Sequence, residues 1–440
     1  METKKYKLLI KNAAQVVCVR TDDSEIACGP EEQGRVDVVA GPASVAVGVD
    51  GRIAAVGPDA SVLATLGVDE SAFAAVVDAA GGCVLPGLVD AHTHPVWAGD
   101  RVGEFALKLA GASYMEVHRQ GGGIGSTVRA TRAASEETLG ALLRARADRM
   151  LAAGTTLAEA KSGYGLDTAS ELKLLRVLHR HNTASGHPLE LVATLLGAHS
   201  VPEGTDAETQ TRLIIDEMIP AVAAARARGE VGPEFCDVFH ETGIFDQDQT
   251  RRILLAGRAH GLAPNFHGDE LSHAGSAELA AEPGLAPRAI SHLERVSDAG
   301  IAAMAAQRTV AVVLPTTAYL MRLAPPPVRR MIAAGVPVAL GSDYNPNAHC
   351  LSMPATMNIA CVLCHMTMPE ALVAATLNAA ASIGRARDYG SLQVGRYADC
   401  LILAAPRWEH IIYQIADPPI THVFKKGSLV FKAVEHPIIM

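Results

Sequence analysis

Short apolar runs and longer amphipathic stretches alternate along the middle of this 440-residue chain. Such alternation is typical of βα units, in which helices join the strands of a parallel sheet. Ser135 is the expected N-cap of one helix, and Thr168-Ala169-Ser170-Glu171 is an expected capping box at the start of the next. The expected strands are Leu88–Ala91, Thr155–Ala160, Leu189–Leu196, Cys236–His240, Ala263–Phe266, Ala289–Ser291, Val310–Leu314 and Val336–Leu340. Eight such strands predict an α/β fold, a (β/α)₈ TIM-type barrel.

Polar side chains that can carry chemistry follow nearly every expected strand. In strand order they are His92 and His94, Lys161 and Tyr164, His199, His240 and Glu241, His267 and Glu270, His292, Thr316, and Asp343 and Asn345. Helical stretches also contain histidines, at positions 118, 179, 181 and 260, which we interpret as surface or packing residues. Because the carboxyl ends of barrel strands meet on one face, the first group predicts an active site there.

Two histidines one residue apart end the first expected strand, in the stretch C-V-L-P-G-L-V-D-A-H-T-H-P (Cys83–Pro95). Period-two alternation places His92 and His94 on the same face. Alone, such a pair is as often solvated or packed as metal-binding, His267 is more often structural, and Asp343 more often belongs to a turn. Together, at matching strand ends, they predict three nitrogen donors and one oxygen donor around one zinc or other first-row metal ion. Such an ion activates a bound water for attack on a carbonyl or amidine carbon.

Both ends of the chain have the short, turn-punctuated runs of an antiparallel sheet. From Tyr6 to about Val77, β-like runs are separated by Gly, Pro and Asp, and Asp50-Gly51 indicates a hairpin. The same pattern returns only in the stretches 390–405 and 421–433. We therefore expect a small β-sandwich domain built from residues 1–82 and 388–440, with residues 83–387 forming the barrel.

Composition excludes several classes of protein. A hydrophobic content of 49% with 19% charged residues indicates a compact globular protein, and the net charge of -9 argues against nucleic acid or an anionic membrane surface as partner. No apolar run reaches the roughly 18 residues of a membrane span, and residues 1–11 lack the apolar core of a signal peptide. Eight scattered cysteines indicate reduced thiols. We expect a cytoplasmic enzyme.

The stretch Gly82–His94 resembles the amidohydrolase superfamily, as do His267-Gly268-Asp269-Glu270 and Gly395–Asp399. Within it, the chain is similar to the imidazolonepropionase family from about residue 80 to 430. The motifs that carry this closer resemblance are Pro95–Arg101, Gly121–Ile124, Lys161–Gly165, Gly197–His199, Phe266–Glu270 and Leu314–Ala318. The resemblance implies hydrolysis of 4-imidazolone-5-propanoate, the cyclic amide formed in histidine degradation, to N-formimidoyl-L-glutamate. It also implies a homodimer and one zinc or iron ion per chain.

Residue roles follow from the same resemblance. His92, His94, His267 and Asp343 match metal ligands, and Glu270 and His292 match acid/base positions. Substrate-binding positions are matched by Arg101, Tyr164, His199 and Glu270, and Asn345 matches a residue that contacts the product's carboxylate region. Tyr114 is a weaker match, and Asn347 and Ala348 are also expected to bind the substrate. At Asn347-Ala348 the chain departs from bacterial members, which have Gly followed by Ser or Thr, and resembles the animal branch. Some relatives bridge two metals with a carboxylated lysine, so Lys161 is notable, but we expect one metal here.

The substrate's chemistry explains this residue set. A guanidinium pairs with a carboxylate through two hydrogen bonds, so Arg101 is expected to bind the propionate, although a solvated loop arginine is the alternative. In our hypothesis His292 and the metal polarise the ring carbonyl, and Asp343 or Glu270 receives the water's proton. Glu270 then protonates the leaving ring nitrogen, and reaches the cavity only if the chain turns sharply at Gly268-Asp269.

Two other functions use the same sequence features. A deaminase of a purine or pyrimidine ring would employ the same histidine, glutamate and aspartate set, but Arg101 and the Lys161–Gly165 run favour a carboxylate-bearing imidazolone. A non-catalytic scaffold descended from a hydrolase would have lost ligands. All four ligands and both acid/base residues are present in this sequence, which argues against that reading.

Overall fold

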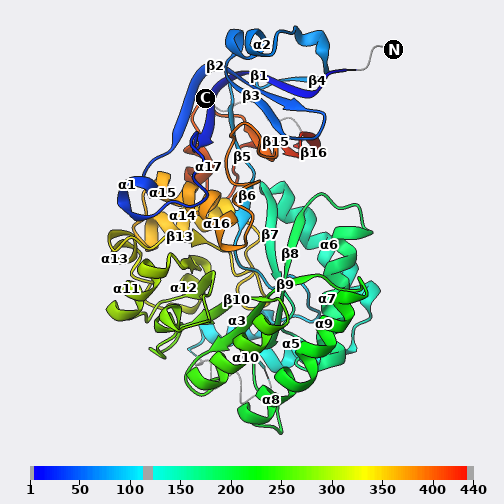
Figure 1. Cartoon of the computed structure of the whole chain (residues 1–440), viewed down its shortest axis with the longest axis vertical. Helices are drawn as coiled ribbons and strands as arrows, with labels where there is room; N and C mark the ends of the chain where they lie inside the picture. The colour runs from blue at the N-terminus through cyan, green and yellow to red at the C-terminus, as the bar shows by residue number, and fades with distance from the viewer. Residues whose placement is uncertain (1–3, 112–121, 434–440) are drawn as a thin grey trace.

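The computed structural model describes residues 4–111 and 122–433 and contains two sheets of eight strands each. One sheet is a parallel barrel surrounded by helices, and the other is a mixed sheet that contains both ends of the described chain (Figure 1). Among these residues no helix combines the length and the apolar character needed to cross a membrane.

The barrel strands follow one another in chain order, each paired in parallel with the next. They are β6 (Leu88–Asp90), β7 (Thr155–Lys161), β8 (Glu190–Ala198), β9 (Pro233–His240), β10 (Ala263–Gly268), β11 (Ala289–His292), β12 (Val310–Val313) and β13 (Val338–Leu340). Past the strand ends, β6 meets β13 through a bridge between Thr93 and Tyr344 and a bond of 3.0 Å from Asp343 N to the His92 carbonyl. All eight expected strands are confirmed, each within three residues of its expected ends.

Helices follow most of the barrel strands and cover the outside of the barrel (Figure 1). They are α3 (Val102–Leu109), α5 (Ile124–Ala133), α6 (Glu136–Ala152), α7 (Thr168–Thr183), α8 (Ala207–Leu213), α9 (Ile219–Ala227), α10 (Gln247–Ala259), α11 (Asp298–Gln307), α12 (Pro315–Met321), α13 (Val328–Ala333), α14 (Met353–Leu363), α15 (Met368–Ala374) and α16 (Leu377–Ser382). The large core lies between these helices and the strands.

One expected helix start is confirmed and the other is wrong. Ser135 caps α6 by accepting a bond of 3.2 Å from Thr138 N. At α7 the cap is Asp167, which accepts from Ser170 N at 2.8 Å, and Thr168 is already helical. Glu171 therefore does not close a capping box. It is fully buried and accepts from the backbone N–H groups of residues 163, 165 and 166, because the loop after β7 has donors that the chain must satisfy internally.

The second sheet joins the two ends of the chain. Its strands are β1 (Tyr6–Val19), β2 (Asp37–Gly48), β3 (Ile53–Pro58), β4 (Phe73–Asp78), β5 (Cys83–Pro86), β14 (Cys400–Leu403), β15 (Ile420–Lys425) and β16 (Ser428–Lys432). The segments that carry these strands also contain α1 (Gly29–Gln33), α2 (Asp59–Leu66) and α17 (His410–Tyr413), of which α2 packs on β2 and β3. The β2–β3 hairpin turns at Asp50-Gly51 as expected. Inward side chains from both ends share one core, among them Val16, Val45 and Phe424. This mixed sheet confirms the expectation that strands from both ends of the chain form a second, separate β-structure.

The small sheet holds the start of the barrel in place. β5 pairs with both β1 and β14, although its residues lie on the barrel side of the expected boundary between residues 82 and 83, and that boundary stays a prediction. Gly87 then leads directly into β6 and donates a bond of 2.8 Å to the Asp399 carbonyl. A Cβ at Gly87 would lie 2.4 Å from Thr156 Oγ1, so only glycine permits this close approach. The position of β6, and of the histidines after it, is thereby fixed.

Candidate active site

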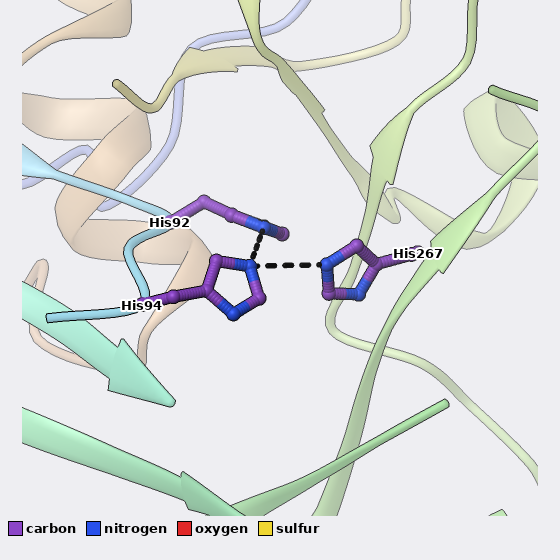
Figure 2. Close-up of side chains that lie close together, drawn as sticks. All are labelled: His92, His94 and His267. Atoms are coloured by element: carbon purple, nitrogen blue, oxygen red, sulfur yellow. Dashed lines mark hydrogen bonds between the residues drawn. The ribbon is translucent and has the colours of Figure 1, made fainter. Parts of the chain in front are cut away.

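Four ligand atoms converge just past the carboxyl ends of three barrel strands. His94 Nε2 lies 3.3 Å from both His92 Nε2 and His267 Nε2. Figure 2 shows the three rings directed toward one another. Asp343 Oδ1 lies 3.5 Å from His92 Nε2 and 3.4 Å from His94 Nε2. None of the four residues is more than 3% exposed. The structure thus brings together the four residues that the sequence predicted as metal ligands.

Neighbouring side chains orient these ligands from behind. His267 Nδ1 lies 2.8 Å from Asp237 Oδ1, and His92 Nδ1 lies 2.9 Å from Ser291 Oγ. Thr317 donates to Asp343 Oδ2 at 2.5 Å. Such partners on the far side of a ligand fix its ring orientation and tautomer, and they leave its other donor atom directed at the centre.

The protonation states suit a metal. Burial, together with the charge on Lys161, lowers the pKa of His92 well below its ordinary value, and burial lowers the pKa of His267. Burial would raise the pKa of Asp343, but its contacts with His92 and His94 outweigh that effect and hold it well below its ordinary value. Neutral imidazoles and an ionised carboxylate are the forms that bind metal ions.

Protein contacts alone do not account for this convergence. The bond from His267 Nδ1 to Asp237 leaves His267 Nε2 without a proton, so only a proton on His94 Nε2 could make that contact a hydrogen bond. The same proton cannot also serve the contact between His94 Nε2 and His92 Nε2, so hydrogen bonds between the rings do not account for both contacts. Asp343 Oδ1 is buried and has no hydrogen-bond partner among the described residues. Tetrahedral ligands about 2.0–2.1 Å from one ion lie about 3.3–3.4 Å from one another, which is the spacing seen here. The cluster is therefore a candidate site for one metal ion.

A pocket of about 560 Å³, counted to its open mouth, lies above this cluster. It combines cluster residues with most of the predicted acid/base and substrate-binding residues. Its lining is His94, Arg101, Ile124, Tyr164, His199, Phe239, His267, Glu270, Leu271, His292, Thr317, Met321, Asp343, Asn345 and Asn347.

Glu270 and His292 stand side by side at this pocket. His292 Nε2 lies 3.6 Å from Glu270 Oε2. Glu270 reaches the pocket because the chain turns at Asp269, whose φ is 51°, as the sequence predicted. Burial, with the charges of Glu294 and Asp343, raises the pKa of Glu270 well above its ordinary value. Burial lowers the pKa of His292 to about 3. The pair therefore consists of a carboxyl group with strengthened basicity and a neutral imidazole.

The backbone around His292 is strained. His292 and Leu293 have φ values of 77° and 72°, in the left-handed region that side chains other than glycine rarely adopt. Behind the ring, Glu294 Oε2 lies 3.8 Å from His292 Nδ1, and burial raises the pKa of Glu294 to about 8. Such strain often accompanies functional sites, and the His292 side chain lines the pocket.

Arg101 supplies a cation to a pocket that is otherwise rich in carboxylates and imidazoles. Its side chain is 5% exposed, and its Nε donates to Glu104 Oε2 at 2.7 Å. Among the described residues its terminal nitrogens have no hydrogen-bond partner. Glu104 in turn accepts from Gly123 N at 2.8 Å, so the guanidinium is anchored through one edge. A guanidinium held in this way presents its other edge to an anion.

His199 and Tyr164 line the pocket on the side of His94. The His199 ring stacks on that of His94, with ring centres 4.9 Å apart, and its Nδ1 lies 2.9 Å from the Gly163 carbonyl. That bond leaves His199 Nε2 as an acceptor. The Tyr164 ring centre lies 5.2 Å from that of His199. Both residues are largely buried and line the pocket.

The remaining predicted substrate residues differ in their placement. Asn345 lines the pocket, but its Oδ1 accepts from the backbone of Asn347 at 2.7 Å and of Ala348 at 3.0 Å. Its side chain thus also shapes the turn after β13. Asn347 lines the pocket and accepts a bond from Lys108, whereas Ala348 is fully buried and lies outside the lining. Tyr114 lies outside the described residues.

Comparison with known proteins places the chain in a family. A model of the amidohydrolase family matches residues 83–430. A probable imidazolonepropionase of Nematostella vectensis is 50% identical over 430 residues, or 96% of this chain and 99% of that protein. One of Danio rerio is 51% identical over 434 residues, or 98% of each chain. This chain belongs to the imidazolonepropionase family.

The likeness to solved structures concerns the fold. A crystal structure of an adenosine deaminase from Xanthomonas campestris with bound zinc matches with a TM-score of 0.69 at 18% identity, over 96% of this chain and 92% of that one. This likeness supports a barrel with a second sheet as the fold of this chain. The predicted resemblance to animal members agrees with the Nematostella and Danio relatives.

Sequence reasoning missed several residues of this imidazolonepropionase site. Asp237, Ser291 and Thr317 hold the ligands His267, His92 and Asp343. Asp237 is 1% exposed and lies within the otherwise apolar part of β9. A charged residue inside a short apolar run is itself a detectable sign of a buried partner.

Metal content tests the cluster directly. Elemental analysis of the purified protein should find one equivalent of a first-row transition metal per chain. The His267→Ala variant should retain less than about a tenth of it, because only three of the four protein donors would then remain around the ion. His260→Ala, which changes an exposed histidine at the end of α10, is the control and should retain the full equivalent. Two equivalents per chain, or equal metal in both variants, would contradict the assignment.

Proposed function

We propose that this chain hydrolyses 4-imidazolone-5-propanoate to N-formimidoyl-L-glutamate, a step in histidine degradation. Its relatives named probable imidazolonepropionase are about half identical over nearly the whole chain. The observation that carries the proposal is that Arg101 lines the same pocket as the histidine cluster and Glu270. A hydrolase for this substrate needs a water-activating centre, a proton carrier and a carboxylate site, and this pocket offers a group for each.

The proposed metal is zinc or iron, held by His92, His94, His267 and Asp343. When bound, it would supply a polarising charge that activates the attacking water and the ring carbonyl. One ion per chain fits the position of Lys161, whose ammonium lies between Glu159 and Asp237, at 2.7 and 2.8 Å. An amine paired with two carboxylates is not available as a carboxylated bridge between two metals. The zinc in the related adenosine deaminase fold supports zinc as one of the two candidates.

Proton transfer is assigned to Glu270. Its raised pKa makes the carboxylate a better base than an ordinary glutamate and lets it return the proton later. As the water oxygen bonds to the ring carbonyl carbon, Glu270 takes the water's proton. When the carbon–nitrogen bond breaks, the same proton passes to the leaving ring nitrogen. His292, next to Glu270, would polarise the carbonyl oxygen. Asp343 is the alternative proton acceptor, but both of its oxygens already face the cluster or Thr317.

Substrate binding is proposed to depend on charge at one end of the pocket and on rings at the other. Arg101 would pair with the propionate. Tyr164 and His199 would contact the imidazolone ring, and Asn345 would contact the carboxylate region. Tyr114, Asn347 and Ala348 are further proposed substrate-binding residues. A deaminase of a nucleobase-like ring remains the alternative, and it would have no carboxylate for Arg101 to bind. A cytoplasmic homodimer without nucleic-acid or membrane partners completes the proposal.

The decisive assay follows the loss of freshly generated 4-imidazolone-5-propanoate on addition of enzyme. We expect turnover by the wild-type protein and its loss after chelation. Glu270→Gln should retain metal but lose on the order of 100- to 10,000-fold in kcat, the usual effect of a general acid/base. Glu208→Gln, on the surface in α8, is the matched control and should match the wild type. Wild-type release of ammonia from a nucleobase without turnover of the imidazolone would favour the deaminase instead.

The carboxylate site has its own test. Arg101→Gln should raise KM roughly 10- to 100-fold, the effect of losing hydrogen bonds to a charged group, with a smaller change in kcat. Arg101→Lys keeps the charge but not the paired geometry, so its KM should lie between those of the wild type and Arg101→Gln. Arg251→Gln removes an exposed arginine of α10 and should leave KM unchanged. A wild-type KM in Arg101→Gln would remove Arg101 from substrate binding.

A further inference from the structure

Three charged side chains form a buried row of ion pairs beneath the ligand cluster. Glu159 and Lys161 point inward from β7, and Asp237 comes from β9. Each is at most 1% exposed. Lys161 Nζ lies 2.7 Å from Glu159 Oε1 and 2.8 Å from Asp237 Oδ2, so one ammonium joins two carboxylates. Burying three charges is costly, and pairs of this kind persist where geometry demands them.

One end of this row, Asp237, holds His267, the metal ligand on β10. Asp237 Oδ1 lies 2.8 Å from His267 Nδ1 and accepts from His267 N at 3.1 Å. Asp237 thus fixes both the ring and the backbone of that ligand. Its other oxygen is the one that faces Lys161. The direction of the Asp237 carboxylate is therefore set by Lys161 on one side and by His267 on the other.

The other end holds the ligands that follow β6. Thr93 stands between His92 and His94, and its N–H donates to Glu159 Oε2 at 3.2 Å. Its hydroxyl donates to the Glu159 carbonyl at 2.6 Å, and its own carbonyl accepts from Lys161 N at 3.0 Å. Thr194 also donates to Glu159 Oε1. Every partner of the Glu159 carboxylate is a donor, so it acts as a fixed acceptor that holds the His92–His94 segment.

We propose that Lys161 is a positioning residue that sets the spacing between the ligands of β6 and the ligand of β10, and thereby the affinity of the site for its metal. β7, β8 and β9 separate these two strands in the sheet, and the path Thr93–Glu159–Lys161–Asp237–His267 spans that distance with side-chain contacts. Without Nζ, two buried carboxylates would face each other unpaired and would move apart. The inference rests on the proposed metal-dependent function.

The test compares zinc affinity in two lysine variants of the full chain, stripped with a chelator and titrated with Zn²⁺ against a chromophoric competitor. Lys161→Met should bind Zn²⁺ about 10- to 100-fold more weakly than wild type, as changes behind metal ligands usually do. Lys425→Met is the matched control. Lys425 is also buried, bonded to Asp399 Oδ2 at 2.7 Å and the Thr156 carbonyl at 3.0 Å, but it belongs to β15 of the other sheet. Its zinc affinity should equal that of wild type.

Thermal unfolding separates positioning from general stability. Both variants should have a lower Tm without metal, because each leaves a buried carboxylate unpaired. The rise in Tm on adding Zn²⁺ should be smaller only in Lys161→Met, because that rise reports affinity for the folded state. If Lys161→Met does not fold, Glu159→Gln replaces it. That variant keeps Lys161 paired with Asp237 but replaces one of the two acceptor oxygens with an NH2 donor. The side chain can then no longer accept from Thr93 on one side and from Lys161 and Thr194 on the other, and the zinc affinity should also fall.

The outcomes distinguish the two proposals. Equal zinc affinity in wild type and Lys161→Met, an equal loss in Lys161→Met and Lys425→Met, or an unchanged affinity in Glu159→Gln would overturn the positioning role while leaving the hydrolase intact. A wild-type protein that binds no Zn²⁺ would instead overturn the metal-dependent function, and this inference with it.

Discussion

The structure depends on the close, buried approach of three imidazole nitrogens and one carboxylate oxygen. These groups are spaced 3.3 to 3.5 Å apart and are almost fully shielded from solvent. Without a cation, such an arrangement leaves lone pairs facing one another and a carboxylate oxygen without a donor. A barrel tolerates this because its strands are rigid and their ends are fixed by neighbours on both sides. The ligand geometry is thus prepared in advance, at the expense of the apoprotein's stability.

The rest of the chain maintains that geometry at two levels. Nearby, Asp237, Ser291 and Thr317 orient individual ligands, and Lys161 joins the groups behind them. Farther away, the pairing of β5 with β14 and the contact of Gly87 with Asp399 fix the start of β6. After β13, the last strand of the barrel, Gly341 lies so close to His92 that a Cβ there would be 2.7 Å from the histidine's own Cβ. The second sheet therefore contributes to the site without touching the pocket.

Much of this could be predicted from sequence because the decisive patterns are local. Apolar runs marked all eight strands, and polar residues directly after them marked His92, His94, His267, His292 and Asp343. The turn that brings Glu270 to the pocket was foreseen from Gly268-Asp269. The prediction that failed, the capping box of α7, also rested on a local pattern. The capping-box pattern at Thr168–Glu171 matched by residue type, but the unpaired N–H groups of the preceding loop bind the Glu171 carboxylate more strongly.

Contacts across strands could not be foreseen. The pairing of Lys161 with Asp237 depends on the register of β7, β8 and β9, and in parallel strands the local pattern of apolar residues does not specify that register. Likewise, Asn345 was expected only as a substrate contact. Its hydrogen bonds to Asn347 and Ala348 arise from the shape of the turn, which the sequence Asn-Pro-Asn-Ala does not determine.

One titration tests most directly whether the four converging side chains make this protein a metal-dependent hydrolase. The protein is stripped of metal and titrated with the metal that elemental analysis identifies, while the turnover of 4-imidazolone-5-propanoate is measured. Turnover should be absent at the start, rise linearly and reach its plateau at one equivalent per chain. Full turnover by the stripped protein, or a plateau only at two equivalents, would contradict the single four-ligand site.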